Sequence, residues 1–399
     1  MVTRIVYFLL LFLMVYVMHR SGVNLRKKCK ILSGAGVTAV LTYTLNEGLR
    51  FGRGIDYNEY WRVYEIMGSG IDYGTNVGFL YLEKGLLFFN VPWQGCAMFM
   101  SFMFILGTLI FMKNYKDVMP IALPLWVLLF HNVANNLMRW NLAFSFIMIA
   151  LFYLIINEGR LNVKFLVFCC IGCTIHYAIL PVPFIFYFLY KIKKPIVSPF
   201  VCISVFIALS FLFQSEFMLR FVDLFNTLSA LDDKFDSYGD DVEYWLTKSP
   251  GGSHNSSWIG PMDTFLGLFV TLVGHKSMRQ APKPYLFAYN LFLLGFMFRP
   301  ATIQIELIHR YDELFFYQRV IVFGYVIFLY KKGLLIYKNL KMVPLMTTFI
   351  FFLCFLSGTK EVFREKEFKL WYVWNKEKQT PEDMLSLYHN DAWKNQKNN

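Results

Sequence analysis

Residues 139–155 read RWNLAFSFIMIALFYLI, one arginine followed by a run that contains no other charge. Similar runs recur along the whole chain of 399 residues, which is 56% hydrophobic, 19% aromatic and only 17% charged. The apolar residues come in blocks and not at amphipathic spacing, as expected of helices that face lipid on all sides. Since a backbone in lipid must satisfy its own hydrogen bonds, such blocks form helices. The sequence therefore predicts an all-α, polytopic integral membrane protein.

About twelve apolar segments (10–12) are candidate transmembrane helices. They are residues 5–18, 31–46, 95–112, 118–134, 140–157, 164–176, 178–190, 196–213, 258–274, 285–298, 314–330 and 342–357. Several are shorter than the roughly 20 residues that a lipid-facing helix needs, so their number and boundaries are approximate. We expect one transmembrane domain over residues 1–357 and a basic, aromatic tail over residues 358–399.

Lysine and arginine accumulate in every second connection between these segments. Because cytoplasmic loops carry an excess of these residues, the pattern places the amino terminus and the loops 47–94 and 214–257 outside the cytoplasm. The net charge of +12 then reflects topology, and we expect no nucleic-acid binding. The tail also falls outside by parity, although its basic content breaks the charge rule.

The outer loop begins with LRFGRGIDYNEYW, residues 49–61. Its glycines, Gly52 and Gly54, are expected to end the second segment. Asp56 and Glu59 have the spacing of a capping box that starts a new helix. On a purely structural interpretation, Asp56 is a helix cap and the nearby aromatic residues form an interfacial belt. That belt comprises Tyr57, Tyr60, Trp61 and Tyr64.

The two arginines of this stretch suggest a binding site. Arg50 and Arg53 flank glycines whose backbone donors point toward a helix amino terminus, a combination that suits a phosphate or diphosphate. Anchoring to lipid headgroups is the alternative. Arg139 also lies near a helix amino terminus, where snorkelling beside Trp140 is the alternative.

A third group of arginines belongs to a later outer stretch. It comprises Arg299, Arg310 and Arg319, with Glu306, Asp312 and Glu313 as possible ion-pair partners. Arg319 falls inside a predicted span, so it should face a cavity or a partner.

Other polar residues have both structural and chemical interpretations. His176 sits near the outer end of its segment, where an imidazole can accept a proton near neutral pH or serve as a structural donor. Glu83 could simply pair with Lys84 or Arg62. The acidic residues of loop 214–257 fit a solvated surface. The C-x-x-C of Cys170 and Cys173 fits packing in a span.

These landmarks together resemble a known family. The succession comprises GLRFGRGIDYNEYW (48–61), Glu83, NNLMRWNLA (135–143), TIHYAILPVPF (174–184) and HRYDELFFYQR (309–319). It resembles EpsG-like membrane proteins, which are similar to the Wzy-type polymerases of capsule, exopolysaccharide and O-antigen assembly. The family landmarks correspond to Arg50, Gly54, Asp56, Tyr57, Tyr60, Arg139, His176 and Arg310. The family usually has glutamine where Trp140 stands here.

The resemblance implies a glycosyltransferase of GT-C-like fold in the bacterial cytoplasmic (inner) membrane. Its substrates would be two polyprenyl-diphosphate-linked oligosaccharides at the outer face, and a flippase and a chain-length regulator of the same pathway would be candidate partners. Asp56 or His176 would be the catalytic base. The binding residues would be Arg50, Arg53, Tyr57, Tyr60, Glu83, Arg139, Arg299, Arg310 and Arg319. We expect no cofactor, and no metal, because the nearest approach to a D-x-D motif, Asp241 to Glu243, lies in an acid-rich loop.

Two other classes of protein remain open from the sequence. A flippase for lipid-linked sugars would also collect arginines for a diphosphate, but it should place them along a path open to both sides and show repeat symmetry. A membrane acyltransferase that modifies sugars would need its histidine to serve a cytoplasmic acyl donor, whereas His176 is predicted on the outer side.

Overall fold

The computed structural model describes most of the chain. The described residues are 2–28, 30–71, 76–212, 259–302, 310–311, 314–316, 318–334, 342–359, 367–375 and 379–387. The predicted outer loop 214–257 lies outside them, as do the proposed ion-pair partners Glu306, Asp312 and Glu313 and much of the predicted tail. The all-α prediction holds for the described residues, where the extended pairing amounts to one isolated bridge.

The chain divides into two compact units, which are described separately. Unit 1 comprises residues 1–188 and 354–399, and unit 2 comprises residues 189–353. Unit 1 contains α1 (Val2–Lys28), α2 (Gly34–Gly48), α3 (Ile55–Gly68), α4 (Val77–Phe88), α5 (Trp93–Met112), η1 (Lys113–Val118), α6 (Met119–Asn136), α7 (Met138–Ile156), α8 (Val163–Ile175), η2 (Tyr177–Ile179), η4 (Glu367–Leu370) and η5 (Val373–Asn375). Unit 2 contains α10 (Pro199–Leu212), α13 (Ile259–Met278), α14 (Lys283–Thr302) and α16 (Arg319–Lys331). The boundaries fall within α9 (Pro181–Lys191) and α17 (Met342–Thr359).

Each of the twelve predicted apolar segments contains a helix. In the described chain, four apolar stretches are long enough to cross a membrane, namely Val2–Lys27, Trp93–His131, Met138–Ile156 and Leu314–Lys331. Several other apolar helices are shorter, such as Val163–Ile175. At 1.5 Å per residue, such a helix does not span the roughly 30 Å of a bilayer core. The helices therefore indicate a membrane protein, while about twelve crossings and a GT-C-like fold stay predictions.

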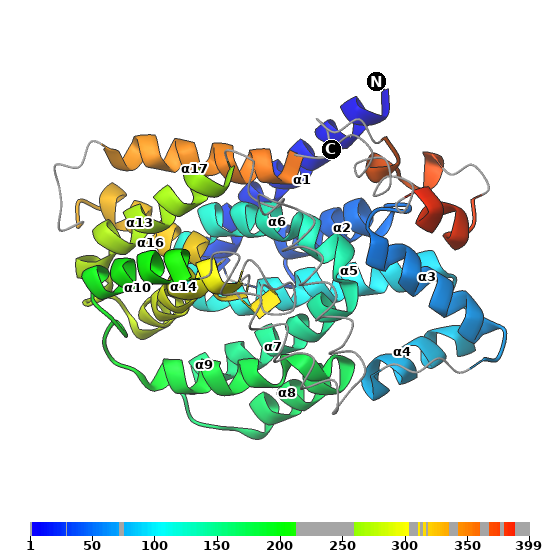
Figure 1. Cartoon of the computed structure of the whole chain (residues 1–399), viewed down its shortest axis with the longest axis horizontal. Helices are drawn as coiled ribbons and strands as arrows, with labels where there is room; N and C mark the ends of the chain where they lie inside the picture. Colours follow the sequence, from blue (N-terminus) through cyan, green and yellow to red (C-terminus); the bar gives the residue numbers. More distant parts are fainter. Residues whose placement is uncertain are drawn as a thin grey trace. The chain divides into compact units, whose positions relative to one another are not determined.

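The core of unit 1 is a helix bundle (Figure 1). In it, α1 packs against α2 and α6, α5 packs against α2 and α7, and α7 packs against α8. Small residues allow close approach between the helices, as is common in membrane proteins. A Cβ atom added at Gly107 of α5 would lie 2.7 Å from the backbone oxygen of Ser145 of α7. Trp126 and Trp140 are fully buried in this interior.

Several helix ends meet at one end of this bundle, which we call the loop end of unit 1. The backbone N–H of Asp56 in α3 donates to Oδ1 of Asn136, the last residue of α6, at 3.2 Å. The N–H of Tyr177, just after α8, donates to Oδ1 of Asn76, just before α4, at 2.7 Å. Parts of the loop 47–94, the end of α6 and the turn after α8 therefore lie together. Their side of the membrane stays a prediction.

The predicted capping box of α3 is wrong. The residue before the first turn is Gly54, whose φ of +101° is accessible to glycine, and Asp56 is the second residue inside the helix. The side chain of Asn58 instead closes the turn, donating to the carbonyls of Gly52 at 3.2 Å and Gly54 at 2.8 Å. Glu59 binds a different partner, Arg62, at 2.5 Å. Gly54 lets the helix begin earlier than the side-chain pattern suggests.

Unit 2 is organised around stacked aromatic rings. Phe206 of α10 stacks on Phe296 of α14 with ring centres 4.8 Å apart. Phe316 stacks on the same column, 6.1 Å from Phe296. Asn290 of α14 fixes the chain before α10 by donating to the carbonyl of Lys194 and accepting from the N–H of Ile196, both at 3.1 Å.

Candidate functional site

The turn between α2 and α3 carries two buried arginines. Gly52 and Gly54 have positive φ angles of +65° and +101°, so the chain bends sharply between the helices. Arg50 and Arg53 are only 1% and 4% exposed. Arginine is rarely buried to this degree unless it is paired, so the positive charge of each side chain should be compensated by nearby groups.

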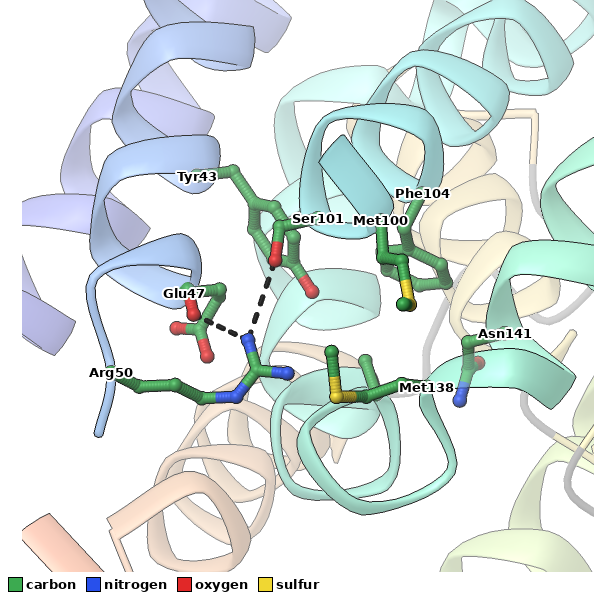
Figure 2. Close-up of a pocket in the computed structure, with 9 residues that line it drawn as sticks. Tyr43, Glu47, Arg50, Met100, Ser101, Phe104, Met138 and Asn141 are labelled. Atoms are coloured by element: carbon green, nitrogen blue, oxygen red, sulfur yellow. Dashed lines mark hydrogen bonds between the residues drawn. The ribbon is translucent and has the colours of Figure 1, made fainter. Parts of the chain in front are cut away.

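Arg50 is held beside a small pocket. Its Nη1 donates to the carbonyl oxygen of Glu47 and, at 3.3 Å, to Oγ of Ser101 in α5. Its guanidinium carbon lies 5.1 Å from the ring centre of Tyr57. Figure 2 shows Arg50 and Glu47 on one side of the pocket and Asn141 of α7 on the other. The lining residues are Tyr43, Glu47, Arg50, Met100, Ser101, Phe104, Ala134, Met138 and Asn141.

Arg53 lies between aromatic rings. Its Nε donates to the carbonyl of Trp371 at 3.1 Å. Its guanidinium carbon is 4.4 Å from the ring centre of Tyr372 and 5.3 Å from that of Tyr7. The terminal nitrogens Nη1 and Nη2 are buried, and neither makes a hydrogen bond of regular geometry among the described residues, although the Tyr372 hydroxyl interacts with the guanidinium. Two strong donors are therefore buried without a satisfied hydrogen bond in the described chain.

The sequence reasoning missed the polar residues that complete this site. Glu47 is 1% exposed, and its Oε1 lies 2.9 Å from Nδ1 of buried His131 and 2.5 Å from Nδ2 of Asn46. The hydroxyl of Tyr7 is 2.6 Å from Nε2 of His131. An ionisable residue within an apolar segment is a recognised functional signal, and it could have identified His131 in the segment 118–134. Glu47 directly follows the predicted segment 31–46, and the structure places it inside α2. We call the complete set the arginine-pair network. It comprises Tyr7, Asn46, Glu47, Arg50, Arg53, His131 and Tyr372.

The charges of this network do not balance. In the described part of the chain, Glu47 is the acidic residue in electrostatic contact with Arg50 and Arg53. Two guanidinium groups therefore share one carboxylate in a buried site. An uncompensated buried charge is costly, so an anion bound here would be stabilised.

A second group of residues surrounds Arg139, the second residue of α7. Its guanidinium carbon lies 5.6 Å from the ring centre of Tyr60 in α3 and 5.7 Å from that of Phe79 in α4. The adjacent Trp140 packs edge-on against His176, with ring centres 5.2 Å apart. We call this group, together with Glu83, the Arg139 cluster. It comprises Tyr60, Phe79, Glu83, Arg139, Trp140 and His176.

Glu83 gives the Arg139 cluster a titratable acid. It lies in α4, outside the candidate spans, and is fully buried with no hydrogen-bond partner for either carboxylate oxygen among the described residues. Burial raises the pKa of Glu83 to about 8, although the charge of Arg139 acts in the opposite direction. Neither of the two ion pairs considered for Glu83, with Lys84 or with Arg62, is present, because both of its carboxylate oxygens lack a hydrogen-bond partner among the described residues. Arg62 binds Glu59 instead. A carboxyl group with this pKa can gain or lose a proton near neutral pH.

The two candidate bases both lie at the loop end of unit 1. Asp56 is half-buried and fixed through its backbone to Asn136. His176 is the residue that ends α8, and its N–H donates to the carbonyl of Gly172 at 3.1 Å. Tyr57 contacts the first site, since its hydroxyl donates to the carbonyl of Arg50 at 3.3 Å. The predicted residues of unit 1 are thus gathered at one end of the bundle.

The remaining predicted arginines belong to unit 2. Arg299 and Arg319 both stack on Phe316, with guanidinium carbons 4.2 and 4.1 Å from the ring centre. Arg319 is the first residue of α16 and is 5% exposed. The sequence predicted that Arg319 faces a cavity or a partner, and the ring of Phe316 is one such partner. Arg310 is half-buried. The prediction that Arg310 converges with Arg53 and Arg139 on a diphosphate stays a prediction, because Arg310 belongs to a different unit.

Comparison with known proteins identifies a family. The EpsG family matches residues 35–369, which is most of the chain. No curated protein and no solved structure matches this chain. The matched range includes Arg50, Arg53 and Arg139 and ends just before Trp371 and Tyr372.

Proposed function

Because the chain belongs to the EpsG family, we propose that it is a Wzy-type polysaccharide polymerase. Family membership indicates a membrane protein of polysaccharide biosynthesis. The specific proposal is transfer of a growing polyprenyl-diphosphate-linked glycan onto a lipid-linked repeat unit. The reaction would take place at the outer face of the bacterial cytoplasmic membrane, with a flippase and a chain-length regulator as pathway partners.

The observation that carries this proposal is the charge imbalance of the arginine-pair network. Buried Arg50 and Arg53 share the carboxylate of Glu47, and the two terminal nitrogens of Arg53 have no satisfied hydrogen bond in the described chain. A diphosphate supplies both the negative charge and the acceptor oxygens that these donors lack. The leaving group of the proposed reaction is such a diphosphate.

The proposed reaction is a substitution at the anomeric carbon of the growing chain. A hydroxyl oxygen of the acceptor sugar forms the new bond to that carbon, and the bond to the lipid diphosphate breaks. Asp56 or His176 accepts the hydroxyl proton, and the arginines stabilise the negative charge that develops on the departing diphosphate. Tyr57, Tyr60 and Glu83 are proposed to contact the substrates.

Purified full-length protein in lipid vesicles provides the test. With purified lipid-linked repeat units as the sole substrate, we expect a ladder of longer glycans and release of polyprenyl diphosphate. Arg53→Gln should reduce elongation by about 100-fold, since it removes a buried charged donor. Arg62→Gln is the matched control, because Arg62 lies in neighbouring α3 but pairs with Glu59 near the surface.

Two results would contradict the proposal. Transbilayer movement of the repeat units without elongation would identify a flippase. Elongation by Arg53→Gln at the parental rate would remove the arginine-pair network from the reaction.

A further inference from the structure

A segment near the carboxyl end lies against the arginine-pair network. Residues 368–375, which we call the strap, lie alongside the turn between α2 and α3, to which backbone hydrogen bonds join them. They fall in the orange-red part of the colour bar of Figure 1. Within the strap, Phe368, Leu370 and Tyr372 are buried, whereas the residues between and after them, Lys369, Trp371 and Val373, are only partly buried. This alternation gives the strap an inner and an outer face. The start of the strap, in η4, also packs against α1.

Backbone hydrogen bonds fix the register of the strap. Arg50 and Tyr372 form an antiparallel bridge. The N–H of Phe51 donates to the carbonyl of Trp371 at 3.0 Å, and the N–H of Val373 donates to the carbonyl of Leu49 at 2.9 Å. The strap is therefore paired with the same short stretch that carries the buried arginines.

Three contacts connect the strap to Arg53 and its surroundings. The carbonyl of Trp371 accepts from Nε of Arg53, and the ring of Tyr372 lies 4.4 Å from the guanidinium carbon. The Tyr372 hydroxyl donates to Oδ1 of Asn46 at 3.0 Å, and Asn46 in turn binds Glu47. These contacts occupy Nε and one face of the guanidinium but leave Nη1 and Nη2 without a satisfied hydrogen bond in the described chain.

We infer that the strap completes the diphosphate site, with Tyr372 and the Trp371 carbonyl as positioning groups for Arg53. The inference rests on the proposed function, since it assigns a role within the same site. A guanidinium fixed through Nε and one face presents its two terminal donors in a defined plane, which is the arrangement that bidentate recognition of phosphate oxygens requires. Groups held in place before binding lose less entropy when the ligand arrives.

The test measures binding and does not depend on polymer formation. Full-length protein in detergent is titrated with farnesyl diphosphate, and with uncharged farnesol as the reference ligand. Tyr372→Leu should weaken farnesyl diphosphate binding by about tenfold, because the ring beneath the guanidinium is lost. Tyr372→Phe keeps that ring and should stay within about threefold of wild type. Farnesol binding should not change in either variant.

Two controls separate positioning from stability. Glu382→Gln alters an exposed side chain of the same carboxyl-terminal region and should bind both ligands like wild type. If Tyr372→Leu is not recovered as folded protein, Tyr372→Met removes the aromatic face with a more adaptable side chain and takes its place.

The outcomes distinguish this inference from the proposed function. Equal binding of farnesyl diphosphate by wild type and Tyr372→Leu, a parallel loss of farnesol binding, or no binding by wild type would each overturn the role of the strap. Selective loss of diphosphate binding would support it. If that loss occurs but wild type forms no polymer, the strap role stands and the polymerase proposal fails.

Discussion

The arginine-pair network and the Arg139 cluster both hold arginine side chains near a buried acid, but their charges and hydrogen bonds differ. Both place guanidinium groups against aromatic rings at the loop end of unit 1. In the network, two arginines share the carboxylate of Glu47, and hydrogen bonds to main-chain carbonyls orient them. In the cluster, Arg139 lies near Glu83, a buried acid whose pKa is raised to about 8 by burial.

This difference suggests that the two groups have different functions, one in binding and one in proton transfer. Arginine stays charged at any relevant pH, so the network provides a fixed positive field suited to binding a diphosphate. Glu83, whose pKa is raised to about 8, can change protonation near neutral pH, and His176 adds an imidazole to the same cluster, so the cluster is suited to moving a proton.

The membrane side of the loop end is an all-or-none prediction. A cysteine introduced by Asn76→Cys, in a background without native cysteines, should react with an impermeant thiol reagent in intact cells, or in spheroplasts if an outer membrane is present. Lys193→Cys, in a predicted cytoplasmic connection, is the control and should react only after lysis. The reverse pattern would place both arginine groups on the cytoplasmic side and remove the proposed site from the outer face.

Removal of the base should have the next largest effect. Because Gly54 and not Asp56 precedes the first turn of α3, Asp56→Asn leaves the start of the helix intact. Either Asp56→Asn or His176→Gln should lower the turnover of lipid-linked repeat units by about 100-fold or more, with normal expression and a similar KM. Turnover close to the parental value in both variants would exclude each residue as an essential base.

Arginine-to-lysine variants, which keep the positive charge, distinguish anchoring to lipid headgroups from recognition of a diphosphate. Lysine cannot reproduce the planar donor pair of arginine, so Arg53→Lys, Arg139→Lys and Arg310→Lys should each lower polymer formation by about tenfold. Binding to lipid headgroups would tolerate lysine. Polymer of parental amount and length from all three variants, at equal expression, would show that these arginines serve only as lipid anchors.

The smallest expected effect concerns the pH dependence of stability. Folding raises the pKa of Glu83 from 4.5 to about 8, so the folded protein retains a proton that the unfolded chain releases. This contribution to stability is fully present below about pH 4.5 and is lost as the pH rises to about 8. Glu83→Gln stays neutral and should remove this dependence.

The measurement compares melting temperatures of the two proteins in detergent at pH 5 and pH 9. Between pH 5 and pH 9, the melting temperature of the wild type should fall by roughly 2–4 °C more than that of Glu83→Gln. Parallel pH profiles would show that Glu83 does not titrate in this range. The Arg139 cluster would then have no acid that exchanges a proton near neutral pH, and this difference from the arginine-pair network would disappear.

The sequence predicted much of the local structure. Every predicted apolar segment contains a helix, because an apolar block in a membrane environment must form its own hydrogen bonds. The helix that was predicted to start near Asp56 is present as α3, and the break before Arg139 is present at Leu137. The family resemblance is confirmed over residues 35–369. The capping box failed because Gly54, through its backbone freedom, starts the helix two residues before Asp56.

The apolar segments, their ends and the charges at those ends can be read from the sequence, since these properties depend on neighbours along the chain. Which of those charges meet depends on how the helices pack. Arg53 contacts Trp371 across 318 positions, and His131 contacts Tyr7 across 124. No local periodicity encodes such pairs, because they arise when separate helices pack and the chain ends return to the bundle. Among the described residues, the excess of buried positive charge exists only in that packed arrangement, which is why the order of residues indicated Arg50 and Arg53 but not their partners Glu47, His131 and Tyr372.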